Sequence, residues 1–78
     1  MNIINSEISK LIKYLMEEQN LTIKNLCQLC GLSEKTILKL IDCKIEPTIN
    51  MLSKICNVFS INTCEFFDTI INKNYITA

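Results

Sequence analysis

The sequence predicts a compact, all-α domain of five helices. The chain of 78 residues has one glycine and one proline to interrupt helices, and 49% of its residues are hydrophobic. Apolar residues recur at the three- and four-residue spacing of amphipathic helices, and good N-cap residues precede several of these stretches. We therefore expect one domain over residues 1–78, whose small core would gain stability from association with a second copy.

Apolar periodicity and a stop signal indicate the first two helices. From Ser6 onward one face of the first helix carries Ile8, Leu11, Ile12, Leu15 and Met16. Thr22 is a suitable N-cap for a short second helix. Gly31 supplies its C-terminal stop, because glycine enters the left-handed conformation without strain.

The third helix follows after a short turn. Ser33 is its predicted N-cap, and a single residue separates Ser33 from Gly31. The buried face of this helix is marked by Ile37, Leu40 and Ile41. Two helices joined by about three residues that include glycine have the helix-turn-helix layout, which we place at residues 22–42.

Two more helices are expected after Pro47, which suits the segment before a helix. Thr48 can cap the fourth, and Asn62 with Glu65 resembles a capping box that opens the fifth. The C-terminal segment is rich in apolar side chains, namely Phe67, Ile70, Ile71, Tyr75 and Ile76. Because these exceed what one small helix can bury alone, residues 68–78 are a predicted dimerisation tail.

Net charge gives no direct argument for a partner. Eight lysines balance eight acidic residues, and there is no arginine to grip guanine edges or phosphates. Residues 21–44 are nevertheless locally basic, with four lysines against two acids. No apolar run reaches the roughly 18 residues of a membrane span and the start lacks a signal-peptide layout, so we expect a soluble, cytoplasmic protein.

The C-x-x-C pair Cys27 and Cys30 allows three interpretations. Free cysteine often packs as a small buried hydrophobe, and we expect this role here. A zinc site would need two more ligands, and without histidine the candidates are carboxylates and Cys43, Cys56 and Cys64. A redox pair favours a helix N-terminus, whereas this pair ends a helix. The zinc and redox alternatives stay open, and no cofactor is expected.

The combined spacing of these signals resembles the lambda-repressor-like, XRE-type helix-turn-helix family of DNA-binding regulators. The resemblance covers roughly residues 8–67 and is carried by Thr22, Leu26, Gly31, Ser33, Thr36, Ile37, Pro47, Leu52 and Phe66. It implies a five-helix lambda-repressor-like fold and double-stranded DNA as the partner. In this family the second helix crosses the DNA backbone and the third enters the major groove.

The resemblance implies a set of DNA-binding residues: Thr22, Ile23, Ser33, Glu34, Lys35, Thr36, Lys39 and Lys44. Of these, the base-reading residues would be Glu34, Lys35, Thr36 and Lys39. The amide end of the second helix and Lys44 would contact phosphates. Leu38, on the same face as Lys39, is either a plain exposed apolar residue or a contact to a thymine methyl group.

The chain departs from the family pattern at several positions. Ile23 stands where a phosphate-holding glutamine is common, and Cys43 stands where glycine is common, so we expect an altered or slightly strained turn there. Met16 and Ile41 occupy positions that often hold a buried Arg–Glu pair, and we expect these two apolar side chains to pack together.

The leading functional hypothesis is a sequence-specific transcriptional regulator, a repressor that acts as a homodimer on a pseudo-palindromic operator. We do not expect an enzyme, because the sequence shows no histidine-assisted nucleophile, spaced acid–base pair or phosphate-cradling glycine loop. The alternative is an antitoxin-like or antirepressor-like protein-interaction module with little DNA affinity. Zero net charge and the missing glutamine and arginine favour that alternative.

Overall fold

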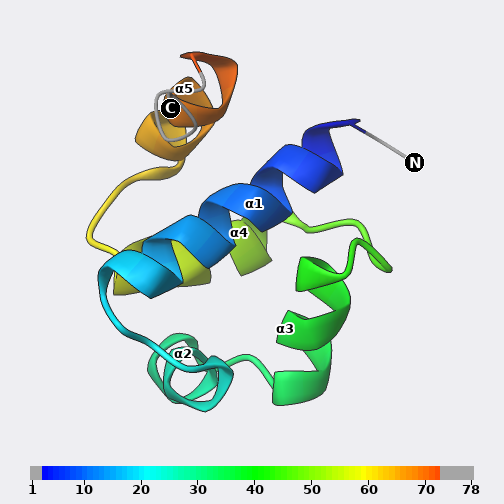
Figure 1. Cartoon of the computed structure of the whole chain (residues 1–78), viewed down its shortest axis with the longest axis vertical. Helices are drawn as coiled ribbons and strands as arrows, with labels where there is room; N and C mark the ends of the chain where they lie inside the picture. The colour runs from blue at the N-terminus through cyan, green and yellow to red at the C-terminus, as the bar shows by residue number, and fades with distance from the viewer. Residues whose placement is uncertain (1–2, 73–78) are drawn as a thin grey trace.

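The computed structural model describes residues 3–72 and confirms the predicted all-α, five-helix architecture over that range (Figure 1). The helices are α1 (Ile3–Glu18), α2 (Ile23–Cys30), α3 (Glu34–Ile41), α4 (Ile49–Val58) and α5 (Thr63–Asn72). α1 begins about one turn before Ser6, where the apolar pattern starts, because nothing in the residues before Ser6 interrupts a helix. Within the described range, no helix combines the length and apolarity needed to cross a membrane.

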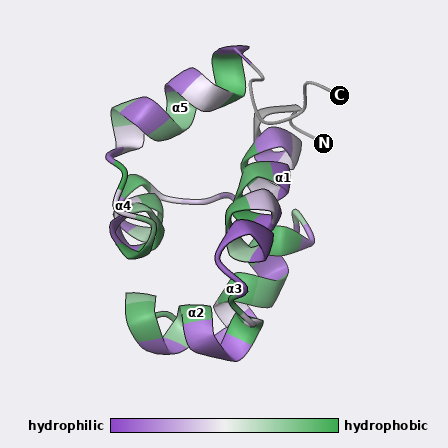
Figure 2. Cartoon of the chain, turned by 60° about the vertical axis from the view of Figure 1, so that its left-hand side comes forward, coloured by the Kyte–Doolittle hydropathy of each residue, from purple (hydrophilic) through white to green (hydrophobic). Residues whose placement is uncertain are grey.

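The helices pack around one core, with α1 against α3 and α5, and α2 against α3 and α4. The α2–α3 pair lies at the end of the domain opposite to α5 (Figures 1 and 2). Every helix contributes a side chain to the core that is at most 3% exposed, including Ile12, Leu26, Ile37, Ile55 and Phe66. Hydrophobic and hydrophilic residues alternate along the helices in Figure 2, as expected of amphipathic helices.

All four predicted N-cap residues accept a hydrogen bond from the backbone amide three residues later. The caps are Thr22 with Asn25 at 3.1 Å, Ser33 with Thr36 at 3.1 Å, Thr48 with Met51 at 3.1 Å and Asn62 with Glu65 at 2.8 Å. Glu65 also accepts a bond from the Asn62 amide at 3.3 Å, so the predicted capping box is confirmed. The starts of α2 to α5 are therefore set by local hydrogen bonds.

The helix ends use the left-handed conformation, and mostly without glycine. Gly31 ends α2 with φ 81°, as predicted, but Asn20, Cys43 and Ser60 also have positive φ, at 54°, 60° and 58°. After α3, the amide of Cys43 donates to the carbonyl of Leu40 at 3.1 Å, in the pattern of a Schellman motif. The strained turn expected at Cys43 is thus present, since an L-residue occupies a position that favours glycine.

The C-terminal apolar residues are not all surface residues, which corrects part of the dimer prediction. Ile70 is 3% exposed and belongs to the core, and Phe67 is partly buried with its ring edge-on to Phe66, the centroids 5.7 Å apart. Ile71 alone of the predicted tail residues up to Asn72 is a large exposed apolar side chain, at 72%. Tyr75 and Ile76 lie outside the described residues.

Candidate nucleic-acid interface

The α2–α3 pair forms a helix-turn-helix with a turn of three residues, 31–33. The Gly31 amide bonds the carbonyl of Cys27 at 2.9 Å and closes α2, and the Ser33 cap then opens α3. Leu26 in α2 and Ile37 in α3 are fully buried and hold the two helices on the core. The predicted motif at 22–42 therefore has the local geometry expected of it.

The outer face of α3 carries the predicted base-reading lysines. Lys35 and Lys39 are exposed, and their spacing of four residues places them on one side of the helix. Leu38 lies on the same face and is 48% exposed, whereas Ile37 and Leu40 on the opposite face are buried. α3 thus presents two lysines and one leucine to any partner that approaches from outside.

The first turn of α3 is polar and internally bonded. The hydroxyls of Ser33 and Thr36 lie 2.9 Å apart in a hydrogen bond, and Thr36 is half-buried. Each hydroxyl keeps further bonding capacity, because it has one hydrogen and two lone pairs. Glu34 is exposed in this turn, where a negative charge is favoured by the helix dipole.

The amide end of α2 is available to an anion. Thr22 and Asn25 bond each other reciprocally, which satisfies the amides of these two residues. The amides of Ile23 and Lys24 lie in the first turn, where a helix has no acceptor of its own, and α2 has no acidic residue there. The Ile23 side chain is half-buried against the core, so a contact from Ile23 would come from its backbone.

Lys44 is exposed in the segment just after α3, and its amide donates to the carbonyl of Lys39 at 2.8 Å. That bond belongs to the same turn in which Cys43 takes the left-handed conformation. The structure therefore places all eight predicted residues on α2, α3 or their flanking turns, with Ile23 and Thr36 half-buried and the other six exposed.

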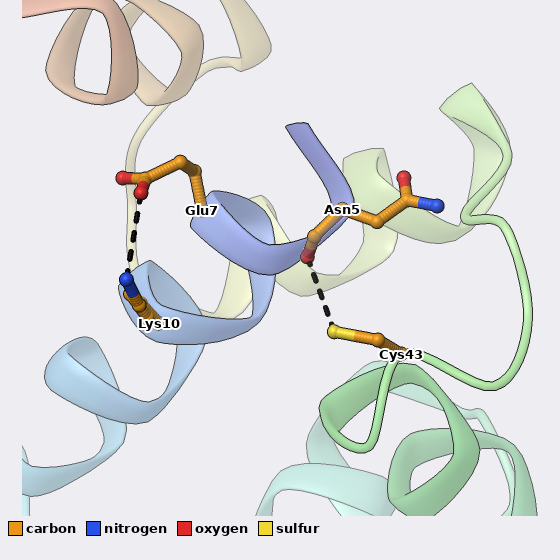
Figure 3. Close-up of polar contacts among 4 residues, drawn as sticks. All are labelled: Asn5, Glu7, Lys10 and Cys43. Atoms are coloured by element: carbon orange, nitrogen blue, oxygen red, sulfur yellow. Dashed lines mark hydrogen bonds and ion pairs between the residues drawn. The ribbon is translucent and has the colours of Figure 1, made fainter. Parts of the chain in front are cut away.

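Two contacts from α1 that no sequence pattern predicted hold the end of α3. The Ser9 hydroxyl, 3% exposed, donates to the carbonyl of Ile41. The Cys43 thiol points to the carbonyl of Asn5 at 3.6 Å, one turn earlier on α1 (Figure 3). Ser9 could have been noticed, because it lies three residues before Ile12 on the edge of the apolar stripe, where its hydroxyl needs a partner.

A second buried polar side chain on α1 was also not anticipated. Glu7 is 7% exposed and forms an ion pair with Lys10 at 3.6 Å, one turn along the helix (Figure 3). Glu7 is thus a buried acidic residue, whereas its partner Lys10 is exposed. The charge of Glu7 is therefore partly compensated from the solvent side.

The cysteine pair packs in the core, as expected. Cys27 and Cys30 are each 8% exposed, and Cys56 is 1% exposed. Burial raises the pKa of the Cys27 thiol, and the neighbouring Cys30 and Glu34 raise it further; burial alone raises that of Cys56. A raised pKa opposes the thiolate that redox and metal chemistry require. Among residues 3–72, no three His, Cys, Asp or Glu side chains gather as metal ligands would.

Met16 and Ile41 border a shared surface pocket. Met16 is buried and Ile41 half-buried, so neither side chain extends fully into solvent. Leu21 and Ile23 complete the apolar wall, and Lys13 and Glu17 lie at the same pocket. Met16 and Ile41 therefore line the same pocket, next to the start of α2 and the end of α3, and direct packing of their side chains stays a prediction.

Comparison with known proteins identifies a family for the chain. The family model for the Cro/C1-type HTH DNA-binding domain matches residues 11–71, a span that runs from α1 into the last turn of α5. No curated protein and no solved structure shows a significant match to the chain.

Proposed function

The chain belongs to the Cro/C1-type helix-turn-helix DNA-binding domain family, and from this premise we propose that it is a sequence-specific transcriptional regulator that binds double-stranded DNA. The observation that carries the proposal is the exposed lysine pair on the outer face of α3, Lys35 and Lys39. In this arrangement α3 enters the major groove, and side chains of its outer face reach base edges.

The phosphate contacts in this proposal come from positions that flank α3. The open amides at Ile23 and Lys24 offer a positive helix end to one phosphate, and Lys44 offers an ammonium group to another. Such contacts orient the protein on the duplex, so that Glu34, Lys35, Thr36 and Lys39 meet base edges. With no arginine in the chain, we expect modest affinity and a preference for A·T-rich sites.

We further propose that the regulator is a repressor that binds a pseudo-palindromic operator as a homodimer. A dimer places two α3 helices about 34 Å apart, one helical turn of DNA, and a bound dimer excludes other proteins from that site. Ile71, 72% exposed at the end of α5, supports an interface at the C-terminal end. Deletion of residues 68–78 would also remove the core residue Ile70, so a substitution at Ile71 is the more specific test of this interface.

Sedimentation tests the dimer. At tens of micromolar the full chain should sediment as a dimer, and Ile71→Ser should shift it toward the monomer. Ile49→Ser is the matched control, since Ile49 is 67% exposed and begins α4, a different helix from the one that carries Ile71. A monomeric full chain at that concentration contradicts the two-half-site arrangement, and an equal shift in both variants contradicts the placement of the interface.

Selection of bound duplexes from a random pool tests DNA binding. We expect enrichment of a sequence, affinity that falls as salt rises, and loss of binding in a Lys35→Ala, Lys39→Ala double variant. Lys54→Ala, which removes an exposed lysine from α4, should bind nearly as the unaltered chain does. Failure to enrich any sequence, or unchanged binding in the double variant, rejects the proposal.

Zero net charge keeps the protein-interaction module as a second candidate, with Leu29 (63% exposed) and Leu38 (48% exposed) as apolar contacts on the α2–α3 pair. On this alternative the chain docks to another protein and binds DNA weakly. Its discriminating property is salt dependence: phosphate neutralisation makes DNA binding fall steeply with salt, and apolar protein docking does not.

A further inference from the structure

Leu38 is a large apolar side chain exposed on the outer face of α3. It lies three residues after Lys35 and one before Lys39, and it remains 48% exposed although Ile37 and Leu40 beside it are buried. A single exposed leucine is ordinary on a protein surface. This one lies between two lysines on the helix that the proposed function inserts into the major groove.

The neighbouring charges define what can cover Leu38. Lys35 and Lys39 favour an anionic partner, so a DNA groove lined by phosphates fits this face electrostatically. A leucine side chain has no donor or acceptor, so it cannot read the hydrogen-bonding edge of a base. In the major groove of DNA, the apolar group that a base pair presents is the C5 methyl of thymine.

We propose that Leu38 selects a thymine in the bound duplex by packing against its C5 methyl group. The inference rests on the proposed function and deepens it, because it assigns one base of the recognised sequence to one side chain. The flanking lysines reach a neighbouring base edge or phosphate, whereas Leu38 discriminates by shape and apolar contact. The contact also removes a partly exposed leucine from water.

Deoxyuridine isolates this contact, since it pairs as thymine does and keeps the O4 acceptor in the groove but lacks the methyl group. Burial of one methyl group contributes about 0.8 kcal/mol, which corresponds to a fourfold change in affinity. In the sequence enriched by selection, replacement of each thymine in turn by deoxyuridine should therefore weaken binding about fourfold at one position of each half-site.

Two leucine variants assign the effect to its side chain. Leu38→Ala should bind the thymine and deoxyuridine duplexes with equal affinity at the sensitive position. Leu29→Ala is the matched control, because Leu29 is 63% exposed on α2 and should keep the fourfold difference. Thermal melting of both variants should match the unaltered chain, since each truncates an exposed side chain.

The outcomes separate this inference from the proposed function. If a duplex is enriched but no thymine is sensitive to deoxyuridine, or if the fourfold difference persists in Leu38→Ala, the inference is wrong while DNA binding stands. Loss of the difference in Leu29→Ala as well would also overturn it. If no duplex is enriched at all, the proposed function and the inference fail together.

Discussion

Replacement of Ser60 by glycine should stabilise the domain, because Ser60 adopts a conformation that suits glycine better. Ser60 is exposed between α4 and α5 with φ 58°, and its amide donates to the carbonyl of Asn57 at 3.2 Å. The left-handed conformation costs an L-residue about 1 to 2 kcal/mol. Glycine also stabilises the unfolded chain by about 0.4 to 1 kcal/mol, because it has more conformational freedom there, and this offsets part of the relief. The net gain in the free energy of unfolding should therefore be roughly 1 kcal/mol.

Urea unfolding followed by circular dichroism measures this gain. The midpoint should rise without a change of slope, and the melting temperature should increase by about 4 to 8 °C for each kcal/mol gained. Ser53→Gly is the control: the same substitution inside α4 should destabilise the domain by about 0.5 kcal/mol. If Ser60→Gly is no more stable than the unaltered chain, or Ser53→Gly stabilises equally, the strain argument is refuted.

Cys43→Gly extends the comparison to the turn after α3. Cys43 has nearly the same φ as Ser60, at 60°, but its thiol contacts the carbonyl of Asn5 at 3.6 Å. Glycine relieves the same strain there and removes this contact with α1. We therefore expect a smaller gain than in Ser60→Gly, and the difference between the two variants estimates the contribution of the thiol contact.

Three further predictions concern the interface, the pocket and the thiols. Lys39→Ala should cost about 1 to 3 kcal/mol of DNA-binding free energy and relax the base preference at one operator position. Lys44→Ala should weaken binding to all sequences alike and reduce the slope of affinity against salt by about one charge. If Lys39→Ala also weakens binding to all sequences alike, Lys39 does not read a base. Ile41→Glu should lower the free energy of unfolding in urea by about 1 to 3 kcal/mol, because it places a charge at a half-buried site. A second substitution, Lys13→Ala, should lower it further, because Lys13 lies at the same pocket and its cation is lost. An unchanged urea midpoint in Ile41→Glu would contradict this reasoning. Burial raises the pKa of Cys27 and Cys56 in the folded state, so their contribution to the free energy of unfolding should be complete below the ordinary thiol pKa of about 8.5 and be lost as pH rises through the folded-state values. For the same reason iodoacetamide should label the exposed Cys64 before the two buried thiols. Equal labelling rates, measured by mass spectrometry, would argue against the burial of Cys27 and Cys56.

The positions of the helices and of the helix-turn-helix could be predicted because their signals are local. A cap such as Thr22 or Ser33 bonds an amide three residues away, and Gly31 closes α2 through its own backbone conformation. The lysine pair on α3 could be predicted for the same reason, since a spacing of four residues places both on one face. These features depend on few distant contacts.

Burial along the C-terminal helix depended on the tertiary structure. Phe67, Ile70 and Ile71 are all apolar, and the chain alone does not show which of them its neighbours cover. Packing of α5 against α1 and α4 buries Ile70 and leaves Ile71 outside. The predicted dimer surface was therefore too wide, because it treated the apolar residues as equivalent.

By itself the sequence determined the five helices, the turn at Gly31 and the exposed lysine face, since each follows from hydrogen bonds and periodicity within a few residues. Only the tertiary structure decided how α3 is anchored, through the Ser9 hydroxyl on the carbonyl of Ile41 and the Cys43 thiol on the carbonyl of Asn5. These pairs are separated by 32 and 38 residues. No local pattern encodes such contacts, because they exist only after the core has brought α1 and α3 together.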